Sequence, residues 1–179
     1  ADVTPGDNFF MHVNGGWFDT FELPADKVRY GAFDLLREKS EKITDINGEV
    51  LQLAQDMLET MEKARGIGLA GVQVGVLKRL FVTHANRDKP RVFINPTIIE
   101  TSMDQVEYEE GCLSIPAIYQ EVVRPEAIQI QAWNERGRPF TITADGMLAR
   151  VIKHEFDHLN GVLFIDHLAD AARENGLAF

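Results

Sequence analysis

The segment that most constrains the fold is MLARVIKHEFDHL, residues 147–159, because it places two histidines four residues apart around a glutamate. Residues four apart lie on the same side of a helix, so the imidazole rings of His154 and His158 can reach one metal ion. Val151 and Met147 lie one and two turns before His154 on this face. A neighbouring stripe is also apolar and consists of Leu148, Ile152 and Leu159. A helix that is apolar on so much of its circumference has to be buried, and the rest of the chain has to pack around it.

Elsewhere the sequence contains one further helical pattern and several strand patterns. From Asn47, which can cap a helix, apolar residues follow at helical spacing to a stop near Arg65 and Gly66. Asn160 and Gly161 end the helix that carries the histidines. Five apolar segments bounded by turn residues are typical of strands: RLFVTH, RVFINPTII, EVVRP, AIQIQAW and FTITA. The sequence therefore predicts an α+β fold, in which antiparallel β-sheets pack around a buried C-terminal helix carrying HEFDH.

Composition excludes several classes of function. The 179 residues fit one domain, and 45% hydrophobic with 26% charged residues is typical of a folded globular protein. A formal net charge of −10 argues against binding to nucleic acid through its phosphates. The single cysteine cannot form an internal disulfide, and no segment is apolar over the length needed to cross a bilayer. The opening residues lack a signal sequence, so we expect a cytoplasmic protein without a membrane partner.

The glutamate between the two histidines gives this helix a candidate reaction. Glu155 follows the first histidine, where a carboxylate can take a proton from metal-bound water. The alternative is that both histidines are packed and hydrogen-bonded parts of the core. Burying Glu155 and two imidazoles without a partner is costly, which favours a bound metal ion. For Asp157, which lies between the histidines, we expect a structural ion pair rather than catalysis.

A catalytic site of this kind needs a third protein ligand and one open position. The metzincin pattern requires a histidine where this chain has Phe164, which excludes that class. Thermolysin-like and neprilysin-like enzymes take a glutamate from a second helix downstream, where this chain offers only Glu174 on a short segment. Upstream, the thiolate of Cys112 with the two histidines makes a tetrahedral set with one open place. A lone cysteine is more often a small buried apolar residue, but the histidine pair favours a ligand here.

Three segments resemble the motifs of peptide deformylases in order and spacing: GIGLAGVQ at 66–73, EGCLS at 110–114 and HEFDH at 154–158. The likeness extends from about Leu36 to Leu168 and includes the strand RVFINP. It implies a deformylase-like catalytic domain over residues 36–168. An atypical leading segment, 1–35, precedes this domain, and a short tail, 169–179, follows it.

The resemblance also implies a role for each matching position. The metal ion would be bound by Cys112, His154 and His158. Glu155 would be the general acid and base, and the Gln73 side chain and the Leu113 backbone N–H would donate hydrogen bonds to the oxyanion. The peptide would bind as an added strand to backbone groups of Ile67, Gly68 and Gly111. The methionine side chain would lie at or near Ile67, Glu110, Met147, Arg150 and Val151.

The reaction implied by the resemblance is hydrolysis of the N-formyl group from the initiator methionine of nascent polypeptides, with release of formate. The family commonly uses Fe²⁺ and tolerates Ni²⁺, Co²⁺ or Zn²⁺, and the ligands alone do not choose among these ions. The implied partner is an N-formylmethionyl peptide on a ribosome-associated nascent chain. Some deformylases dock on the ribosome through a longer C-terminal helix, which the tail AARENGLAF lacks. Direct binding to nucleic acid is not expected.

The leading segment has a different resemblance. DNFFMHVNGGWFDTFELPADKVRYGAFDLL is similar to the opening of neprilysin-like metallopeptidases, although it holds none of that family's catalytic residues. Two alternative functions therefore stay open. One is a zinc endopeptidase of the HExxH type, which requires a carboxylate ligand downstream. The other is a catalytically silent, metal-bound module that binds formyl peptides, if the leading segment covers the cleft.

Overall fold

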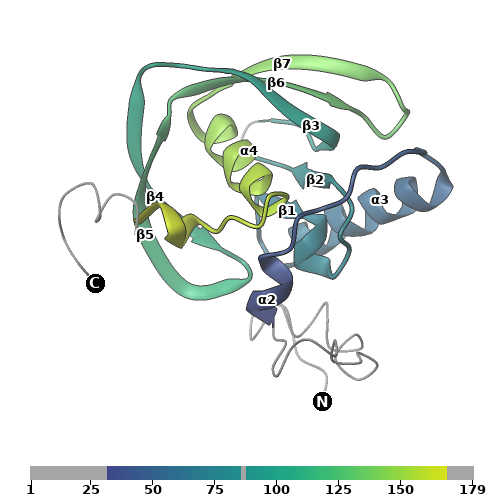
Figure 1. Cartoon of the computed structure of the whole chain (residues 1–179), viewed down its shortest axis with the longest axis horizontal. Helices are drawn as coiled ribbons and strands as arrows, with labels where there is room; N and C mark the ends of the chain where they lie inside the picture. Colours follow the sequence, from purple (N-terminus) through teal and green to yellow (C-terminus); the bar gives the residue numbers. More distant parts are fainter. Residues whose placement is uncertain (1–31, 86–87, 169–179) are drawn as a thin grey trace.

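A computed structural model describes residues 32–85 and 88–168, and two antiparallel sheets surround one central helix in it (Figure 1). The larger sheet has five strands in the order β1-β2-β3-β6-β7, and the smaller sheet pairs β4 with β5. The larger sheet consists of β1 (Gly68–Ala70), β2 (Leu80–Thr83), β3 (Arg91–Thr101), β6 (Ala127–Trp133) and β7 (Pro139–Asp145). The other elements are α2 (Ala32–Leu36), α3 (Gly48–Lys63), the 3₁₀ helix η1 (Gly71–Val74), β4 (Gln105–Cys112), β5 (Ile115–Pro125) and α4 (Gly146–His158). The predicted α+β fold is confirmed.

Helix α4 lies between the sheets and carries HEFDH (Figure 1). It contacts β1, β2, β6 and β7, so both ends of the large sheet's strand order pack against it. Its apolar face joins a core cluster that also includes Phe81, Phe93 and Ile130. The buried positions of α4 include five polar side chains: Arg150, His154, Glu155, Asp157 and His158. Deep burial was expected from the pattern, and these polar groups therefore require partners inside the protein.

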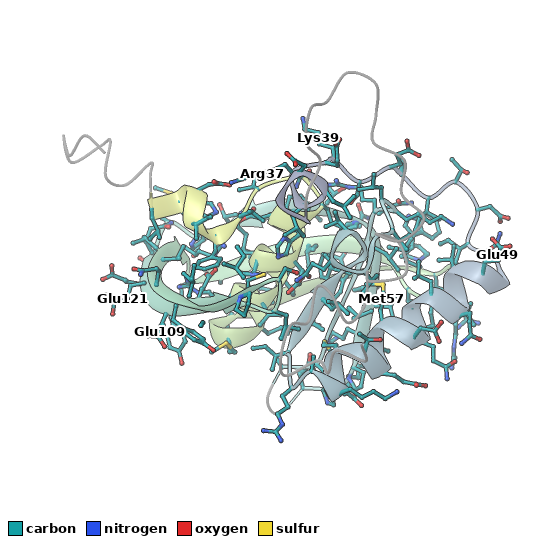
Figure 2. The ribbon with its side chains drawn as sticks, turned by 90° about the horizontal axis from the view of Figure 1, so that it is seen from below. Arg37, Lys39, Glu49, Met57, Glu109 and Glu121 are labelled. Atoms are coloured by element: carbon teal, nitrogen blue, oxygen red, sulfur yellow. The ribbon has the colours of Figure 1, made fainter. Side chains whose placement is uncertain are left out.

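Helix α3 covers the other face of the short strands and forms the second core cluster. Its 16 residues begin after Asn47, whose side chain accepts hydrogen bonds from the N–H groups of Glu49 and Val50 at 3.1 and 3.2 Å. Met57 points from α3 into this cluster (Figure 2). The helix ends near the predicted stop, and Arg65 then adopts a positive φ of 57°. This turn leads the chain into β1, which packs against the central helix α4.

The small sheet differs most from the sequence expectation. We predicted a short strand EVVRP and no strand between it and RVFINPTII, whereas β4 and β5 form a long hairpin there. Strand β4 is acidic and mostly exposed, so it lacks the apolar alternation by which strands are recognised. Glu109 and Glu121 face each other across the hairpin and project outward (Figure 2). Next to the turn the register shifts between Gly111 and Cys112, and Ala117 has a φ of 63°. The hairpin therefore delivers Cys112 to the end of α4.

The first and last described segments are held together. Leu35 and Leu36 are buried in the same cluster as Leu163 and Phe164, which follow α4. Two side chains join these segments as well, because the Arg37 guanidinium makes a bidentate ion pair with the Asp166 carboxylate. The neprilysin-like opening falls almost entirely on residues 1–31, which lie outside the described part, as does the predicted tail 169–179.

Within residues 32–85 and 88–168, no helix combines the length and the apolar character that a membrane span requires. The two long helices, α3 and α4, have 16 and 13 residues. Both have charged residues along their length, and both cover strands of the large sheet.

Two glycines with similar backbone angles provide a matched test of the packing after α4. Gly161 has a φ of 72°, and an added Cβ would collide with the backbone carbonyl of Arg37. Gly137 has a φ of 66° with nothing within 4 Å of an added Cβ. We expect Gly137→Ala to lower the free energy of unfolding by about 1 kcal/mol, which is the cost of a left-handed alanine. We expect Gly161→Ala to lower it by about 1–3 kcal/mol more, because backbone must move.

Urea denaturation of both variants measures this difference. Equal losses of unfolding free energy in the two variants would contradict the close approach of Gly161 to Arg37.

Candidate metal centre

Three side chains converge where the β4–β5 hairpin meets α4. Cys112 ends β4, and His154 and His158 lie one turn apart on α4. One ligand atom from each residue lies within 4.8 Å of the other two. The Cys112 Sγ and the His158 Nε2 are 3.3 Å apart. A tetrahedral site with a metal–sulfur bond of about 2.3 Å and a metal–nitrogen bond of about 2.0 Å has a sulfur–nitrogen edge of about 3.5 Å. The predicted ligand set is therefore brought together at a spacing that fits a divalent metal ion.

The Cys112 side chain favours its deprotonated form, the thiolate, which is the form that binds metals. Burial alone would raise its pKa, but the nearby charge of His158 and hydrogen bonds from both histidines lower the pKa to about 5. The sulfur is therefore a thiolate at neutral pH, and the thiolate is the nucleophilic and metal-binding form. A buried thiolate needs positive charge beside it, which a divalent ion supplies.

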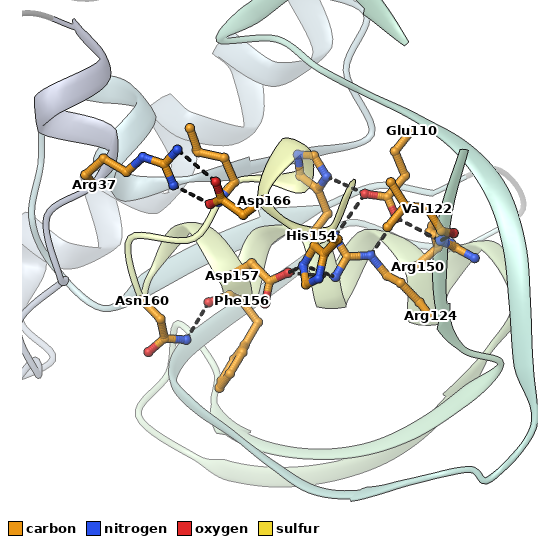
Figure 3. Close-up of polar contacts among 12 residues, drawn as sticks. Arg37, Glu110, Val122, Arg124, Arg150, His154, Phe156, Asp157, Asn160 and Asp166 are labelled. Carbon is orange, nitrogen blue, oxygen red and sulfur yellow. Dashed lines mark hydrogen bonds and ion pairs between the residues drawn. The ribbon is translucent and has the colours of Figure 1, made fainter. Parts of the chain in front are cut away.

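Glu110 fixes the orientation of the first histidine. The Glu110 carboxylate lies 3.0 Å from His154 Nδ1, and its side chain is only 4% exposed (Figure 3). Burial alone would raise the Glu110 pKa, but hydrogen bonds from His154 and Arg124 bring the pKa well below its usual value. An ionised carboxylate only accepts hydrogen bonds, so Nδ1 of His154 carries the proton. Nε2 is then left to bind a metal, which is how carboxylates typically support histidine ligands.

Arg124, a residue that the sequence did not point to, holds this carboxylate. It lies on β5 and donates from Nε and Nη2 to Glu110 at 2.6 and 2.9 Å. Its Nη1 donates to Asp157 at 2.6 Å, so one guanidinium bridges the hairpin and α4 (Figure 3). The predicted structural ion pair of Asp157 is therefore confirmed. Arg150 also donates to Glu110, at 2.9 Å, and to the backbone carbonyls of Val122 and Val106.

Glu155 lines the same cleft as the ligands Cys112 and His154. Its side chain is buried, and burial raises the pKa of its carboxyl group to about 7. Among the described residues, its Oε2 atom has no hydrogen-bond partner. The backbone of Gly68 on β1 approaches so closely that an added Cβ would collide with the Glu155 carboxylate and with Val151. Glu155 is thus a buried acid with one oxygen available to a ligand.

Gln73 is buried beside the sulfur ligand. It belongs to η1, and its Oε1 accepts a hydrogen bond from the Ala70 N–H at 2.8 Å. This bond turns the amide nitrogen toward Cys112 Sγ at 3.6 Å and Ser114 Oγ at 3.1 Å. Leu113 follows Cys112 directly, so its backbone N–H lies in the same turn. The positions predicted for oxyanion donors therefore lie next to the ligands, and their role stays a prediction.

A cleft of about 810 Å³ opens onto Glu155. Every position predicted to bind substrate lines this cleft: Ile67, Gly68, Glu110, Gly111, Met147, Arg150 and Val151. The Glu110 carboxylate contacts both the Arg150 guanidinium and the ligand His154, so the charges of Glu110 and Arg150 are already paired. Arg65 and Tyr119 also line the cleft and were not predicted, because each stands alone in the sequence as an ordinary exposed residue. Glu174, the ligand required by the endopeptidase alternative, lies outside the described residues.

Comparison with known proteins places these features in one family. The sequence model of the polypeptide deformylase family matches residues 26–174. The peptide deformylase of Agrobacterium fabrum is 50% identical over 144 residues, which cover 78% of this chain and 85% of that protein. The peptide deformylase of Borreliella burgdorferi is 50% identical over 135 residues, which cover 75% of this chain and 82% of that protein. The range matched by the family model includes all of the described residues.

Solved structures agree with the sequence comparison. A peptide deformylase from Synechococcus elongatus in complex with actinonin superposes with a TM-score of 0.74 at 42% identity, covering 88% of this chain and 90% of that one. The peptide deformylase of Thermotoga maritima superposes with a TM-score of 0.74 at 38% identity, covering 79% of this chain and 95% of that one. The shared fold includes the sheets and the central helix.

Removal of the sulfur ligand tests the metal centre directly. We expect Cys112→Ala to reduce the affinity for a divalent metal by more than the about 10- to 100-fold that loss of an outer-shell partner costs. The physical reason is that the variant keeps only the two neutral imidazole ligands and loses the negatively charged thiolate ligand. Titration of metal-free protein with Co²⁺, followed by visible absorption, measures the affinity and reports loss of the sulfur–metal band. An unchanged spectrum and affinity would contradict the assigned ligand set.

Proposed function

This chain belongs to the peptide deformylase family, and from this premise we propose how its own residues perform the family's reaction. It is a metal-dependent hydrolase that removes the N-formyl group from nascent polypeptides. The observation that carries the assignment of residues is the convergence of Cys112, His154 and His158 beside a buried carboxyl group, at the end of a peptide-sized cleft. The reaction splits the amide bond between formyl carbon and methionine nitrogen, giving formate and a free amine.

We propose that Cys112, His154 and His158 hold Fe²⁺ in the cell, and that Zn²⁺, Ni²⁺ or Co²⁺ can replace it. One thiolate and two imidazoles suit these ions better than Mg²⁺ or Ca²⁺, which prefer oxygen ligands. The resemblance described above favours iron among them. When bound, such an ion lowers the pKa of a water molecule and polarises the formyl carbonyl.

We assign proton transfer to Glu155. Its unpartnered Oε2 atom is available to accept a proton from the attacking water. A pKa of about 7 means that burial destabilises the ionised form, so the carboxyl group can both take up and return a proton near neutrality. The same proton then goes to the leaving amine of methionine, and formate departs. Val151 and the backbone of Gly68 hold Glu155 in place and exclude bulk water from one side.

We assign stabilisation of the oxyanion to Gln73 and Leu113. The formyl oxygen gains negative charge when water attacks the carbon. The Gln73 amide nitrogen is held close to the sulfur ligand because its Oε1 is anchored on the Ala70 N–H. The Leu113 backbone N–H, in the turn beside Cys112, is the second donor. Loss of one such donor typically costs about 100- to 1,000-fold in rate.

We propose that the formylmethionyl peptide binds across the two sheets. Strand β1 is an edge strand of the large sheet, so the backbone near Ile67 and Gly68 can pair with an extended peptide. Gly111 of β4 lines the opposite side of the cleft. Met147 and Val151 supply apolar side chains from α4 for the methionine. Arg150 and Glu110 contribute the shape of the pocket, while their charges are paired with each other and with His154.

The substrate also suggests where the enzyme works. Formylated nascent chains emerge from ribosomes, and we propose a cytoplasmic protein that acts on them there. The alternatives suggested by the sequence were a catalytically silent formyl-peptide binder and a zinc endopeptidase. Release of formate excludes the first, and cleavage of an internal peptide bond that survives Cys112→Ala would favour the second. No observation on the described residues favours either alternative.

The role of Glu155 is tested by formate release. We expect protein loaded with Fe²⁺ without oxygen to release formate from a formyl-Met peptide. We expect Glu155→Gln to lower kcat by about 100- to 10,000-fold, because no group then accepts the proton from water. Metal content, measured on the same samples, should stay unchanged. Parallel loading with Zn²⁺, Ni²⁺ and Co²⁺ ranks the metals, and no formate from any loaded sample would refute the proposed function.

The close approach of β1 to the general base gives a second test. We expect Gly68→Ala to lower kcat/KM by about 100-fold, because an added Cβ displaces the Glu155 carboxylate and a shift of about 1 Å has this effect. Gly48→Ala is the matched control, because nothing lies within 4 Å of a Cβ added there. Steady-state formate release from both variants makes the comparison. Wild-type activity of Gly68→Ala would contradict the positions given to Gly68 and Glu155.

A further inference from the structure

A continuous series of polar contacts leads from the metal centre to the surface. It begins at His154, whose Nδ1 is 3.0 Å from Glu110, and passes through the two Arg124 contacts to Glu110. From Arg124 Nη1 it reaches Asp157 at 2.6 Å, and His167 Nε2 lies 2.8 Å from the same Asp157 oxygen. The Arg124 side chain is 1% exposed, whereas that of His167 is 33% exposed. His167 is therefore the outer end of a chain whose inner end is a metal ligand.

We propose that His167 is a positioning residue for the metal centre, acting through Asp157, Arg124 and Glu110 on the ligand His154. The proposal rests on the proposed function only in that His154 is taken to bind the metal. His167 lies beyond the central helix, in the short helical turn 164–168, and contacts none of the three ligands through the bonds described above. It touches neither substrate nor metal and is not a catalytic residue.

The chemistry of each group fixes the direction of these bonds. Arg124 Nη1 can only donate, so the Asp157 oxygen that lies 2.6 Å from it is an acceptor. Nε2 of His167 is then the donor. Its 3.4 Å contact with Arg124 Nη1 brings two nitrogens together that both donate to Asp157, so this contact adds no bond. One Asp157 oxygen thus receives two donors, and His167 shares it with Arg124.

The Arg124 guanidinium transmits a change at this oxygen because it is planar and rigid. Nε and Nη2 are occupied by Glu110, while Nη1 is occupied by Asp157. A shift of Asp157 therefore rotates the whole group and moves its two contacts on Glu110. Since Glu110 in turn fixes the imidazole of His154, the rotation reaches the metal ligand. Because the Arg124 side chain is 1% exposed, water cannot replace a contact that it loses. A shift of Asp157 is therefore passed on to Glu110.

The structural alternative is that His167 merely helps its own helical turn to dock. His84 provides a matched control for this reading. Its Nδ1 lies 3.1 Å from a carboxylate oxygen of Glu62, and its side chain is 38% exposed. Both histidines thus make one contact with a carboxylate at similar exposure. Glu62 leads to no metal ligand through the hydrogen bonds of the described residues, whereas Asp157 leads to His154.

Co²⁺ titration of the metal-free protein tests the proposal without reference to turnover. We expect His167→Ala to weaken Co²⁺ binding by about 3- to 10-fold, below the range for a direct partner of a ligand. We expect His167→Gln to restore the affinity, because its amide N–H can donate to Asp157. His84→Ala should leave the affinity unchanged. Equal affinities of His167→Ala and wild type would overturn the proposal, as would an equal loss in His84→Ala.

A double-mutant cycle separates positioning from general stability. In a Glu110→Gln background the path to His154 is already weakened, so we expect His167→Ala to change the Co²⁺ affinity by less than about twofold. The same fold-loss in both backgrounds would show that His167 acts by another route and would overturn the proposal. If Cys112→Ala retains full Co²⁺ affinity, the assignment of Cys112, His154 and His158 as the metal ligands is wrong. If it loses affinity while His167→Ala does not, only the present inference fails.

Discussion

The geometry of the metal centre depends on the buried ion pairs that the Arg124 guanidinium makes with Glu110 and Asp157. The guanidinium is a fully buried cation between two carboxylates, one on the hairpin that carries Cys112 and one on the helix that carries both histidines. Each carboxylate alone would be too costly to bury, and removing one partner from such a group leaves an uncompensated charge. With all partners present, the hairpin and the helix are held at one separation. The ligand geometry is therefore a consequence of a charge network, which packing of apolar side chains alone would not define.

Helix α4 makes apolar contacts with the large sheet on one side and polar contacts with the hairpin on the other. Apolar residues of the helix face the large sheet and supply most of the burial. On the polar side of the helix, Arg150 and His154 contact Glu110 of the hairpin, and Asp157 contacts Arg124 of the hairpin. Two buried atoms of α4 are exceptions, because Glu155 Oε2 and His158 Nδ1 have no hydrogen-bond partner among the described residues. A buried carboxyl oxygen without a partner, in a cleft that two metal ligands also line, is costly for stability and useful for chemistry.

Some of this could be predicted from the sequence and some could not. The helices were predictable because their apolar periodicity is long and regular, and the ligand set because its residue types restrict the possible chemistry. Strand β4 was missed, since its exposed acidic residues hide the alternation. Arg124 was missed because its partners lie 14 and 33 residues away and nothing local marks it. Glu110 was expected only near the methionine pocket, whereas its carboxylate is directed at His154. Contacts of this kind depend on tertiary structure.

The joining of the first and last described segments has a consequence for synthesis. Arg37 and Asp166 are 129 positions apart, yet they pair, and Leu35 packs in the same cluster as Phe164. During translation the leading helix and the Cys112 hairpin leave the ribosome well before the turn that covers them. Cys112 can therefore meet His154 and His158 only after α4 has been synthesised. The core cluster that joins Leu35 to Phe164 likewise requires the segment after α4. Closure of this domain thus depends on contacts between residues far apart in the sequence, which form more slowly than local ones.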